Sequence, residues 1–234
     1  MTEGMASRIS GIMEKISNTC HASGRNPGEI RLMAVSKLHP LSSVEEAWNN
    51  GIRLFGENRV QEGIEKFTSF RNNGNRAETE IHLIGNLQRN KAKKAAGFFD
   101  CIQSVDREDL VDELGKLTAG QGRPLMVYLE YRTGEESKAG FSDMESLFRA
   151  AEKVLSFPGI KPLGLMTMAP FTADRKAIRA SFRSCRIAAE ELKKRFGKDS
   201  WNSLSMGMSD DFEIAIEEGS NLLRIGTAIF GERQ

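Results

Sequence analysis

The stretch from Ile30 to Phe55, IRLMAVSKLHPLSSVEEAWNNGIRLF, indicates the class of fold by itself. It begins and ends with short runs of mostly apolar residues, and each run is too short to form a helix of its own. The segment between them mixes polar and apolar residues, as does a helix that connects two strands. A strand, a crossover helix and a second strand form the unit from which parallel sheets are built.

The same alternation continues to the end of the chain, so the sequence predicts eight strands. The predicted strands are Ile30–Ser36, Ile52–Phe55, Glu80–Ile84, Cys101–Val105, Leu125–Glu130, Gly159–Met166, Ser203–Met206 and Asn221–Ile225. Eight strand and helix pairs in 234 residues are typical of a single-domain (β/α)8 barrel, which closes its sheet without an edge. We therefore expect one barrel domain over residues 1–234. An open doubly wound sheet is the alternative, although no Gly-x-Gly-x-x-Gly turn follows the first strand.

The segments between the strands carry signals for the starts and ends of helices. Ser42 and Glu45 have the spacing of a capping box, and Gly51 follows as a stop signal. Asp106 stands where it could cap a later helix. The longest helix should end at Gly197 and lay one apolar stripe on the sheet. That stripe consists of Ile178, Phe182, Cys185, Ala189, Leu192 and Phe196.

The composition excludes several classes of protein. Lys and Arg number 33 against 32 Asp and Glu, so no excess of one charge would attract nucleic acid or an anionic membrane. Cys20, Cys101 and Cys185 lack the spacing of a zinc site or a disulfide framework. No apolar run approaches the roughly 18 residues of a membrane span, and Met5–Asn18 is too polar for a signal peptide. We expect a cytoplasmic protein without metal, and a monomer, because no apolar stripe is left once the barrel is built.

Lys37 is the first candidate functional residue because it directly follows the first predicted strand. In α/β barrels the functional groups lie at the carboxyl ends of the strands. Burial there would disfavour the ammonium form of a lysine and lower its pKa, which leaves a free amine for a Schiff base. An exposed loop lysine remains the alternative on position alone.

The last predicted strand carries an arginine, Arg224, inside an apolar run. Alternation sends Leu222, Arg224 and Gly226 to one face and Leu223 and Ile225 to the other. If the second pair faces the helices, the arginine faces the barrel interior, where its charge needs a partner.

Two kinds of partner for Arg224 remain open. The planar guanidinium suits either a carboxylate or a ring-nitrogen acceptor of a ligand. Glu57 and Glu130 are acidic residues at the ends of predicted strands, and a buried ion pair with one of them would need no ligand.

The loops after the seventh and eighth strands contain Ser209, Gly226 and Thr227. Barrels commonly bind phosphate with these two loops, because hydroxyls donate hydrogen bonds and glycine lets the backbone approach an anion. A serine that only caps a helix and a glycine that only turns the chain would have the same sequence. Asp210 and Asp211 favour that plainer interpretation, since acidic residues stabilise the start of a helix without any ligand.

Two further polar residues near strand ends are less informative. His82 alternates with apolar residues, and we interpret it as a core histidine with satisfied hydrogen bonds rather than a catalytic one. Asn58 follows the second predicted strand and could bind a ligand or cap the next helix.

Together these residues resemble the family of pyridoxal phosphate homeostasis proteins, also called the proline synthetase co-transcribed family. The resemblance covers nearly the whole chain. The segments that carry it are AVSK at 34–37, FGENRVQE at 55–62, HLIGNLQRNK at 82–91, GEESK at 134–138, GLMTMA at 164–169, SMGMSDD at 205–211, RIGT at 224–227 and IFG at 229–231. The sequence departs from the family pattern at Ile81, where tryptophan is usual, and at 130–132, where a short polar run with asparagine is usual. Both departures lie near the third and fifth strands, away from the lysine and the phosphate loops.

The resemblance implies a barrel like the N-terminal half of alanine racemase. It implies that pyridoxal 5′-phosphate is bound as an internal aldimine on Lys37 and that Arg224 faces the pyridine nitrogen. The other contacts it implies, beside the ring and at the phosphate, are Asn58, Met206, Ser209, Gly226 and Thr227.

The same resemblance implies a carrier of the cofactor rather than an enzyme. A protonated arginine keeps the ring nitrogen unprotonated, which makes the cofactor a poor electron sink. Racemization also needs a second acid/base, and we expect no further domain to bring one. The expected function is therefore pyridoxal phosphate homeostasis, with release to pyridoxal phosphate-dependent apoenzymes. An amino-acid racemase or lyase is the alternative, and a barrel for another phosphorylated ligand remains if Lys37 is inert.

Overall fold

Parallel strands close into a barrel whose order around the ring is their order along the chain. The computed structural model describes residues 4–72, 78–120, 122–135, 139–197 and 200–232. Within these residues the strands are β1 (Arg31–Val35), β2 (Leu54–Glu57), β3 (Glu80–Leu83), β4 (Cys101–Val105), β5 (Leu125–Glu130), β6 (Ile160–Met166), β7 (Ser203–Ser205) and β8 (Leu222–Ile225). All eight predicted strands are confirmed, with small differences at their ends. The (β/α)8 barrel is confirmed and the open sheet is wrong.

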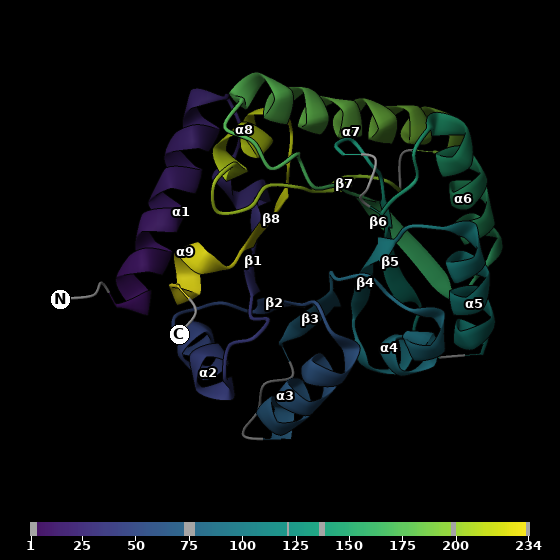
Figure 1. The fold of residues 1–234 in the computed structure, drawn as a ribbon, viewed down its shortest axis with the longest axis horizontal. Coiled ribbons are helices and arrows are strands. Elements are labelled where there is room, and N and C mark those ends of the chain that lie inside the picture. Colours follow the sequence, from purple (N-terminus) through teal and green to yellow (C-terminus); the bar gives the residue numbers. More distant parts are fainter. Residues whose placement is uncertain (1–3, 73–77, 121, 136–138, 198–199, 233–234) are drawn as a thin grey trace.

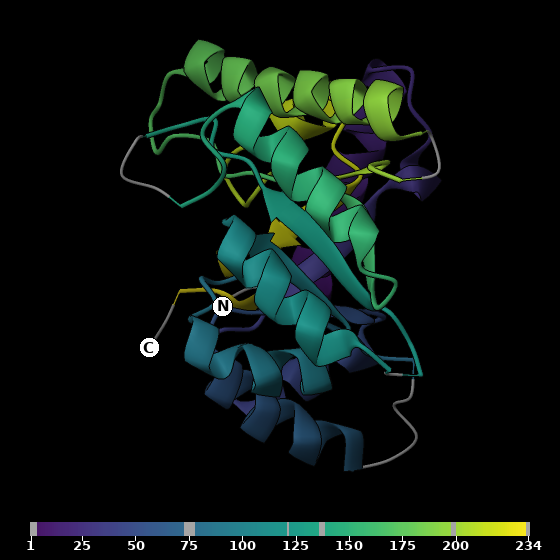
Figure 2. The ribbon, with the colours of Figure 1, turned by 90° about the vertical axis from the view of Figure 1, so that its right-hand side faces the viewer.

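Helices surround the barrel on its outside (Figure 1). They are α1 (Met5–Ala22), α2 (Leu41–Asn49), α3 (Val60–Asn72), α4 (Ala92–Phe98), α5 (Glu108–Thr118), α6 (Met144–Ser156), α7 (Arg175–Phe196), α8 (Phe212–Glu217) and α9 (Thr227–Phe230), with the 3-10 turns η1 (Pro27–Glu29) and η2 (Arg89–Lys91). Figure 1 shows α1 beside α8 and α9, so the first and last helices cover the same side of the barrel. Figure 2 shows α5, α6 and α7 side by side across another side. None of the described helices has the length and apolar character needed to cross a membrane.

Apolar side chains fill two regions that are separated by the sheet. Leu223 and Ile225 of β8 point outward and pack between the sheet and the helices. Leu222 points inward and packs with Met33 and Tyr128 inside the barrel. Arg224 lies on this inner face and is buried, as the alternation along the strand predicted.

The longest helix, α7, agrees with its predicted apolar stripe. Ile178, Phe182, Cys185, Ala189 and Leu192 are buried, and Phe196 at the end of the stripe is partly buried. The helix ends as predicted at a glycine, residue 197, which has a φ of 102°. Glycine adopts this left-handed conformation without the steric cost that a Cβ atom would cause.

The predicted capping box at the start of α2 is wrong. The helix begins at Leu41, directly after Pro40, so Ser42 and Glu45 lie inside it. Proline cannot occupy a helix interior because it lacks an N–H group, but it can precede the first turn. The predicted stop is confirmed, because Gly51 follows the helix at a φ of 92°.

The predicted cap of α5 is also wrong. Arg107 occupies the cap position, and its side chain accepts no cap hydrogen bond because a guanidinium has no acceptor. The carboxylate of Asp106 binds the Arg107 guanidinium at 2.6 Å and accepts from the Asn86 amide at 3.2 Å. The adjacent Arg107 and the distant Asn86, which the fold brings near, therefore bind the Asp106 carboxylate in place of the expected cap.

Candidate functional site

A cavity of about 500 Å³ opens at the carboxyl ends of the strands. Pockets for small ligands and cofactors commonly have such volumes. Of the residues predicted for the site, all but Met206 line this cavity. They are Lys37, Asn58, Ser209, Arg224, Gly226 and Thr227.

The register between β1 and β8 explains why residues from the two ends of the chain meet here. Ala34 is paired with Ile225 in the parallel ladder that closes the barrel. Both strands therefore leave the sheet side by side, and Lys37 and Thr227 follow within a few residues of this pair. Barrel closure places the lysine and the strand-eight loop at one mouth.

An ion pair below Lys37 connects β2 with α3. Glu57 is fully buried, and its Oε1 atom accepts from Lys66 Nζ at 2.8 Å and from the Ser36 hydroxyl at 2.8 Å. Burial raises the pKa of Glu57, while the hydrogen bonds from Lys66 and Ser36 oppose this rise. Glu57 was one proposed partner of Arg224, and that alternative is wrong because its charge is matched by Lys66.

The turn after Lys37 is held by the same helix. Leu38 has a φ of 62°, a left-handed conformation that is unfavourable for a residue with a side chain. Its main-chain N–H donates to Glu62 Oε1 at 2.6 Å, and Glu62 also accepts from Lys66 at 3.1 Å. These contacts offset the unfavourable backbone and direct the chain away from the barrel mouth.

Arg224 reaches the cavity from the barrel interior. Its Nη1 donates to the carbonyl of Ser205 at 2.5 Å and to the hydroxyl of the same residue at 2.9 Å, and its Nη2 donates to the Thr167 carbonyl at 2.8 Å. Burial lowers the pKa of the guanidinium, and the carboxylates of Asp211 and Glu130 oppose this shift. Glu130 therefore attracts Arg224 electrostatically. The hydrogen bonds that Arg224 donates go to uncharged oxygens of Ser205 and Thr167. A ligand in the cavity would therefore face a cation.

Ser209 links the two predicted phosphate loops. Its hydroxyl accepts from the main-chain N–H of Ala228 at 3.4 Å. The interpretation of Ser209 as a helix cap is wrong, because Asp211 occupies the cap position of α8 and accepts from the Met208 N–H at 2.6 Å. Ser209 and Thr227 therefore lie together at the cavity wall.

Asn58 lines the cavity and carries an unmatched acceptor. Its Oδ1 atom is buried and has no hydrogen-bond partner among the residues that the structure describes. A buried acceptor without a partner costs free energy unless a ligand donates to it. The backbone of Asn58 also packs against Gly85, where a Cβ atom would lie 2.3 Å from the Asn58 carbonyl oxygen.

Met206 does not face the cavity. It is fully buried in the core between sheet and helices, because Ser205 beside it points into the barrel and alternation sends Met206 outward.

Met166 and Met168, at and beyond the end of β6, line the cavity together with Phe171, which is 95% exposed. The prediction missed these three, although their position after the sixth strand was a usable signal.

His82 lies inside the barrel and is fully buried. Both ring nitrogens have partners, Gln103 at 2.7 Å and Glu80 at 2.5 Å. This is the satisfied core histidine that the sequence predicted.

Comparison with known proteins shows similarity over nearly the whole chain. Residues 16–234 match the family described as alanine racemase, N-terminal domain. A protein of Aquifex aeolicus named pyridoxal phosphate homeostasis protein is 37% identical over 227 residues, which are 97% of each chain. One of the same name from Escherichia coli strain K12 is 36% identical over 230 residues, 98% of this chain and 97% of that one. The structure of PipY from Synechococcus elongatus PCC7942 with PLP bound is 32% identical, with a TM-score of 0.82 over 97% of this chain and 100% of that one.

Proposed function

This chain belongs to the pyridoxal phosphate homeostasis protein family, and we propose that its cavity holds pyridoxal 5′-phosphate with Lys37 bonded to the aldehyde carbon. The observation that carries the proposal is that Lys37, Arg224 and Thr227 line one cavity. A primary amine, a cation and a hydroxyl-bearing loop match the aldehyde, the ring nitrogen and the phosphate of this cofactor. The unmatched Oδ1 atom of Asn58 fits as well, because it can accept from a donor on the ligand or from a bridging water.

The predicted site residues have distinct parts in this proposal. Ser209 and Thr227 would donate their hydroxyl protons to the phosphate, and Gly226 leaves room for it because it has no side chain. Arg224 would donate to the ring nitrogen. Met206 would contribute packing behind the strand rather than a side-chain contact to the ring.

We further propose that the protein binds and releases the cofactor without catalytic turnover. Bound pyridoxal phosphate supplies an aldehyde that captures primary amines and a ring that can accept electrons. A guanidinium only donates hydrogen bonds, so Arg224 would keep the ring nitrogen in its unprotonated form and weaken the ring as an electron acceptor. In this proposal residues 1–234 act as one monomeric unit in the cytoplasm and pass the cofactor to apoenzymes. The three cysteines support a reducing compartment, because they are buried free thiols.

Borohydride reduction of the protein after incubation with pyridoxal 5′-phosphate, followed by peptide mapping, tests the site. We expect the pyridoxyl group on Lys37, and a Lys37→Ala variant should lose the label from that peptide. Label found only on Lys91 or Lys138 in the wild type would contradict the proposal.

A further inference from the structure

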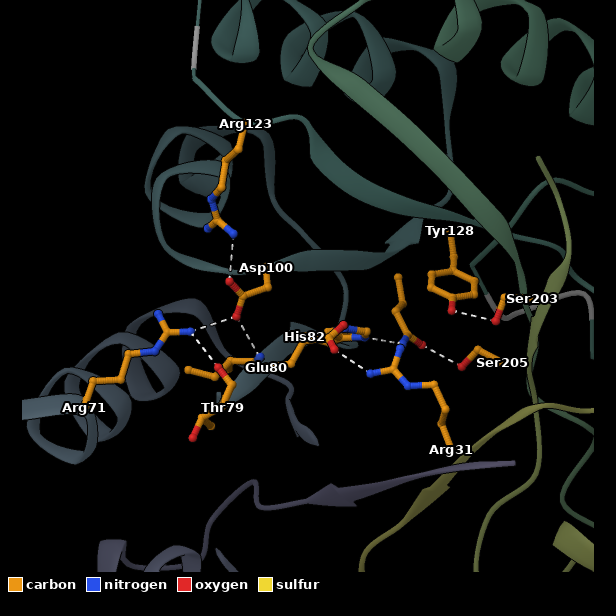
Figure 3. Close-up of polar contacts among 12 residues, drawn as sticks. Arg31, Arg71, Thr79, Glu80, His82, Asp100, Arg123, Tyr128, Ser203 and Ser205 are labelled. Carbon is orange, nitrogen blue, oxygen red and sulfur yellow. Dashed lines mark hydrogen bonds and ion pairs between the residues drawn. The ribbon is translucent and has the colours of Figure 1, made fainter. Parts of the chain in front are cut away.

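A row of polar side chains crosses the barrel interior between Arg224 and the amino ends of the strands. Barrel interiors are usually filled by branched apolar residues, so a buried polar row calls for an explanation. Figure 3 shows Ser205, His82, Glu80 and Arg31 close together and joined by polar contacts. Ser205, His82 and the intervening Gln103 are fully buried.

Each step in the row is short enough to be a hydrogen bond. Ser205 Oγ lies 2.6 Å from Gln103 Oε1, and Gln103 Nε2 lies 2.7 Å from His82 Nδ1. His82 Nε2 lies 2.5 Å from Glu80 Oε1. The second oxygen of Glu80 binds the guanidinium of Arg31, whose side chain is 47% exposed. The row therefore extends from the cavity to solvent at the far end of the barrel.

The direction of these bonds follows from the chemistry of Arg224, which can only donate. Ser205 Oγ accepts from it at 2.9 Å, and the serine proton then points to Gln103 Oε1. The amide N–H of Gln103 faces His82 Nδ1, which must be unprotonated to accept. The single proton of the neutral ring is left on Nε2, where Glu80 accepts it.

The electrostatics of the row agree with this direction. Burial lowers the pKa of His82, and Glu80 opposes the shift. Although burial alone would raise it, the hydrogen bonds from His82 and Arg31 and the charge of Arg31 lower the pKa of Glu80. The charged groups around the imidazole are Glu80, Arg31 and Asp100. A neutral histidine beside an ionised glutamate is the arrangement that the row requires.

We propose that Gln103 is a positioning residue for Arg224 and that, through Ser205, it holds the guanidinium where it meets the cofactor ring. The inference rests on the proposed function of the cavity. Gln103 Oε1 accepts the hydrogen bond that the Ser205 hydroxyl donates. A lone pair of Ser205 Oγ is therefore left to accept from Arg224. His82 and Glu80 keep the Gln103 amide from turning over, because a turned amide would point its oxygen at the unprotonated Nδ1 atom.

The test compares two substitutions inside the barrel. Gln103→Met keeps a similar volume but removes both hydrogen bonds of the amide. Tyr128→Phe is the matched control, because it removes a buried hydroxyl that donates to Ser203 at 2.8 Å and lies outside the row. We expect Gln103→Met to weaken binding of pyridoxal 5′-phosphate on the order of tenfold and to shift the visible absorption maximum of the bound cofactor, with both unchanged in Tyr128→Phe. Equal effects in the two variants, or no effect of Gln103→Met, would overturn the proposal.

A second measurement uses the protein without the cofactor, and its deciding result comes from the wild type. The chain has 3 histidines, so ¹⁵N NMR of the wild-type protein can assign the protonation of each ring. We expect His82 to be neutral with its proton on Nε2. In Gln103→Glu it should become an imidazolium near neutral pH, because a carboxylate oxygen would then face Nδ1. A wild-type His82 with its proton on Nδ1 would overturn the proposal, whereas failure of the wild type to take up pyridoxal 5′-phosphate would refute the proposed function of the cavity instead.

Discussion

Lys66 donates a hydrogen bond of 2.7 Å to the main-chain carbonyl of Ser36, the residue that precedes Lys37. The same ammonium is paired with the buried carboxylate of Glu57. Helix α3 thereby fixes the end of β1 from outside the barrel. The position of the candidate cofactor lysine thus depends on a second lysine that does not line the same cavity.

Replacing Lys66 with methionine should destabilise the protein strongly. Only 9% of the Lys66 side chain and 0% of the Glu57 side chain are exposed, so the variant would leave a buried charge without its partner. Loss of one member of such a pair costs roughly 3–5 kcal/mol. Urea unfolding measures this change. The control is Lys194→Met on α7, whose ion pair with Glu191 is exposed and should contribute far less to stability. Equal stabilities of the two variants would contradict the expectation.

Replacing Ser209 and Thr227 together with alanine should weaken retention of pyridoxal 5′-phosphate. Hydrogen bonds to a charged group contribute roughly 1.5–3 kcal/mol each, so the dissociation constant should rise at least tenfold. Equilibrium dialysis gives the constant, and borohydride labelling at Lys37 should persist at saturating cofactor. Ser156→Ala is the control, because this exposed hydroxyl donates to the Lys153 carbonyl of its own helix. An unchanged constant would place the phosphate elsewhere.

The wild type should not racemize amino acids at an appreciable rate. Arg224 would withhold the ring proton that stabilises a carbanion, and Arg224→Glu would favour that proton. We expect at most slow, unselective exchange of the α-proton in the variant, measured by NMR in deuterated water after its cofactor content has been confirmed by absorption. Fast and stereochemically clean racemization by the wild type would refute the carrier function.

Glu130 should make the stability of the protein depend on pH. Burial, helped by the Asp106 carboxylate and opposed by Arg224, raises its pKa from 4.5 to about 7. The folded state therefore binds the proton more tightly than the unfolded state. The resulting stability is fully present below about pH 4.5 and is lost as the pH rises through 7.

The pH effect can be isolated with Glu130→Gln, which keeps the shape of the neutral side chain. A shift of this size corresponds to at most about 3 kcal/mol, so the wild type should lose up to that much more stability than the variant between about pH 4.5 and 8. Urea unfolding at a series of pH values measures both curves. Parallel curves would show that Glu130 titrates normally.

Gly85→Ala should disturb Asn58 and with it the cavity. The added Cβ would lie 2.3 Å from the Asn58 carbonyl oxygen and 2.7 Å from its Cα atom, so the backbone must shift. We expect a loss of roughly 1–3 kcal/mol in stability together with weaker cofactor binding. Gly97→Ala in α4 is the matched control, because nothing lies within 4 Å of its added Cβ. Helix propensity predicts a gain of up to about 1 kcal/mol there, and similar losses in both variants would be evidence against a specific clash.

The strands could be predicted because their pattern is local. Both β4 (Cys101–Val105) and β5 (Leu125–Glu130) have the predicted bounds, since a short apolar run between polar turns marks a strand without knowledge of its neighbours. The starts of α2 and α5 could not be predicted equally well. At α2, Pro40 occupies the cap position instead of the expected serine. Before α5, Asp106 binds Asn86 instead of capping the helix.

The sequence by itself determined which side chains point into the barrel, because alternation along a strand has a period of two residues and needs no partner. It placed Arg224 inside in this way, and it placed Lys37 at a strand end because this residue directly follows an apolar run. Only the tertiary structure decided what these residues meet. Glu57 binds Lys66 rather than Arg224, and Met206 packs away from the cavity, because hydrogen-bond partners and cavity walls come from strands and helices that barrel closure brings together from distant parts of the chain.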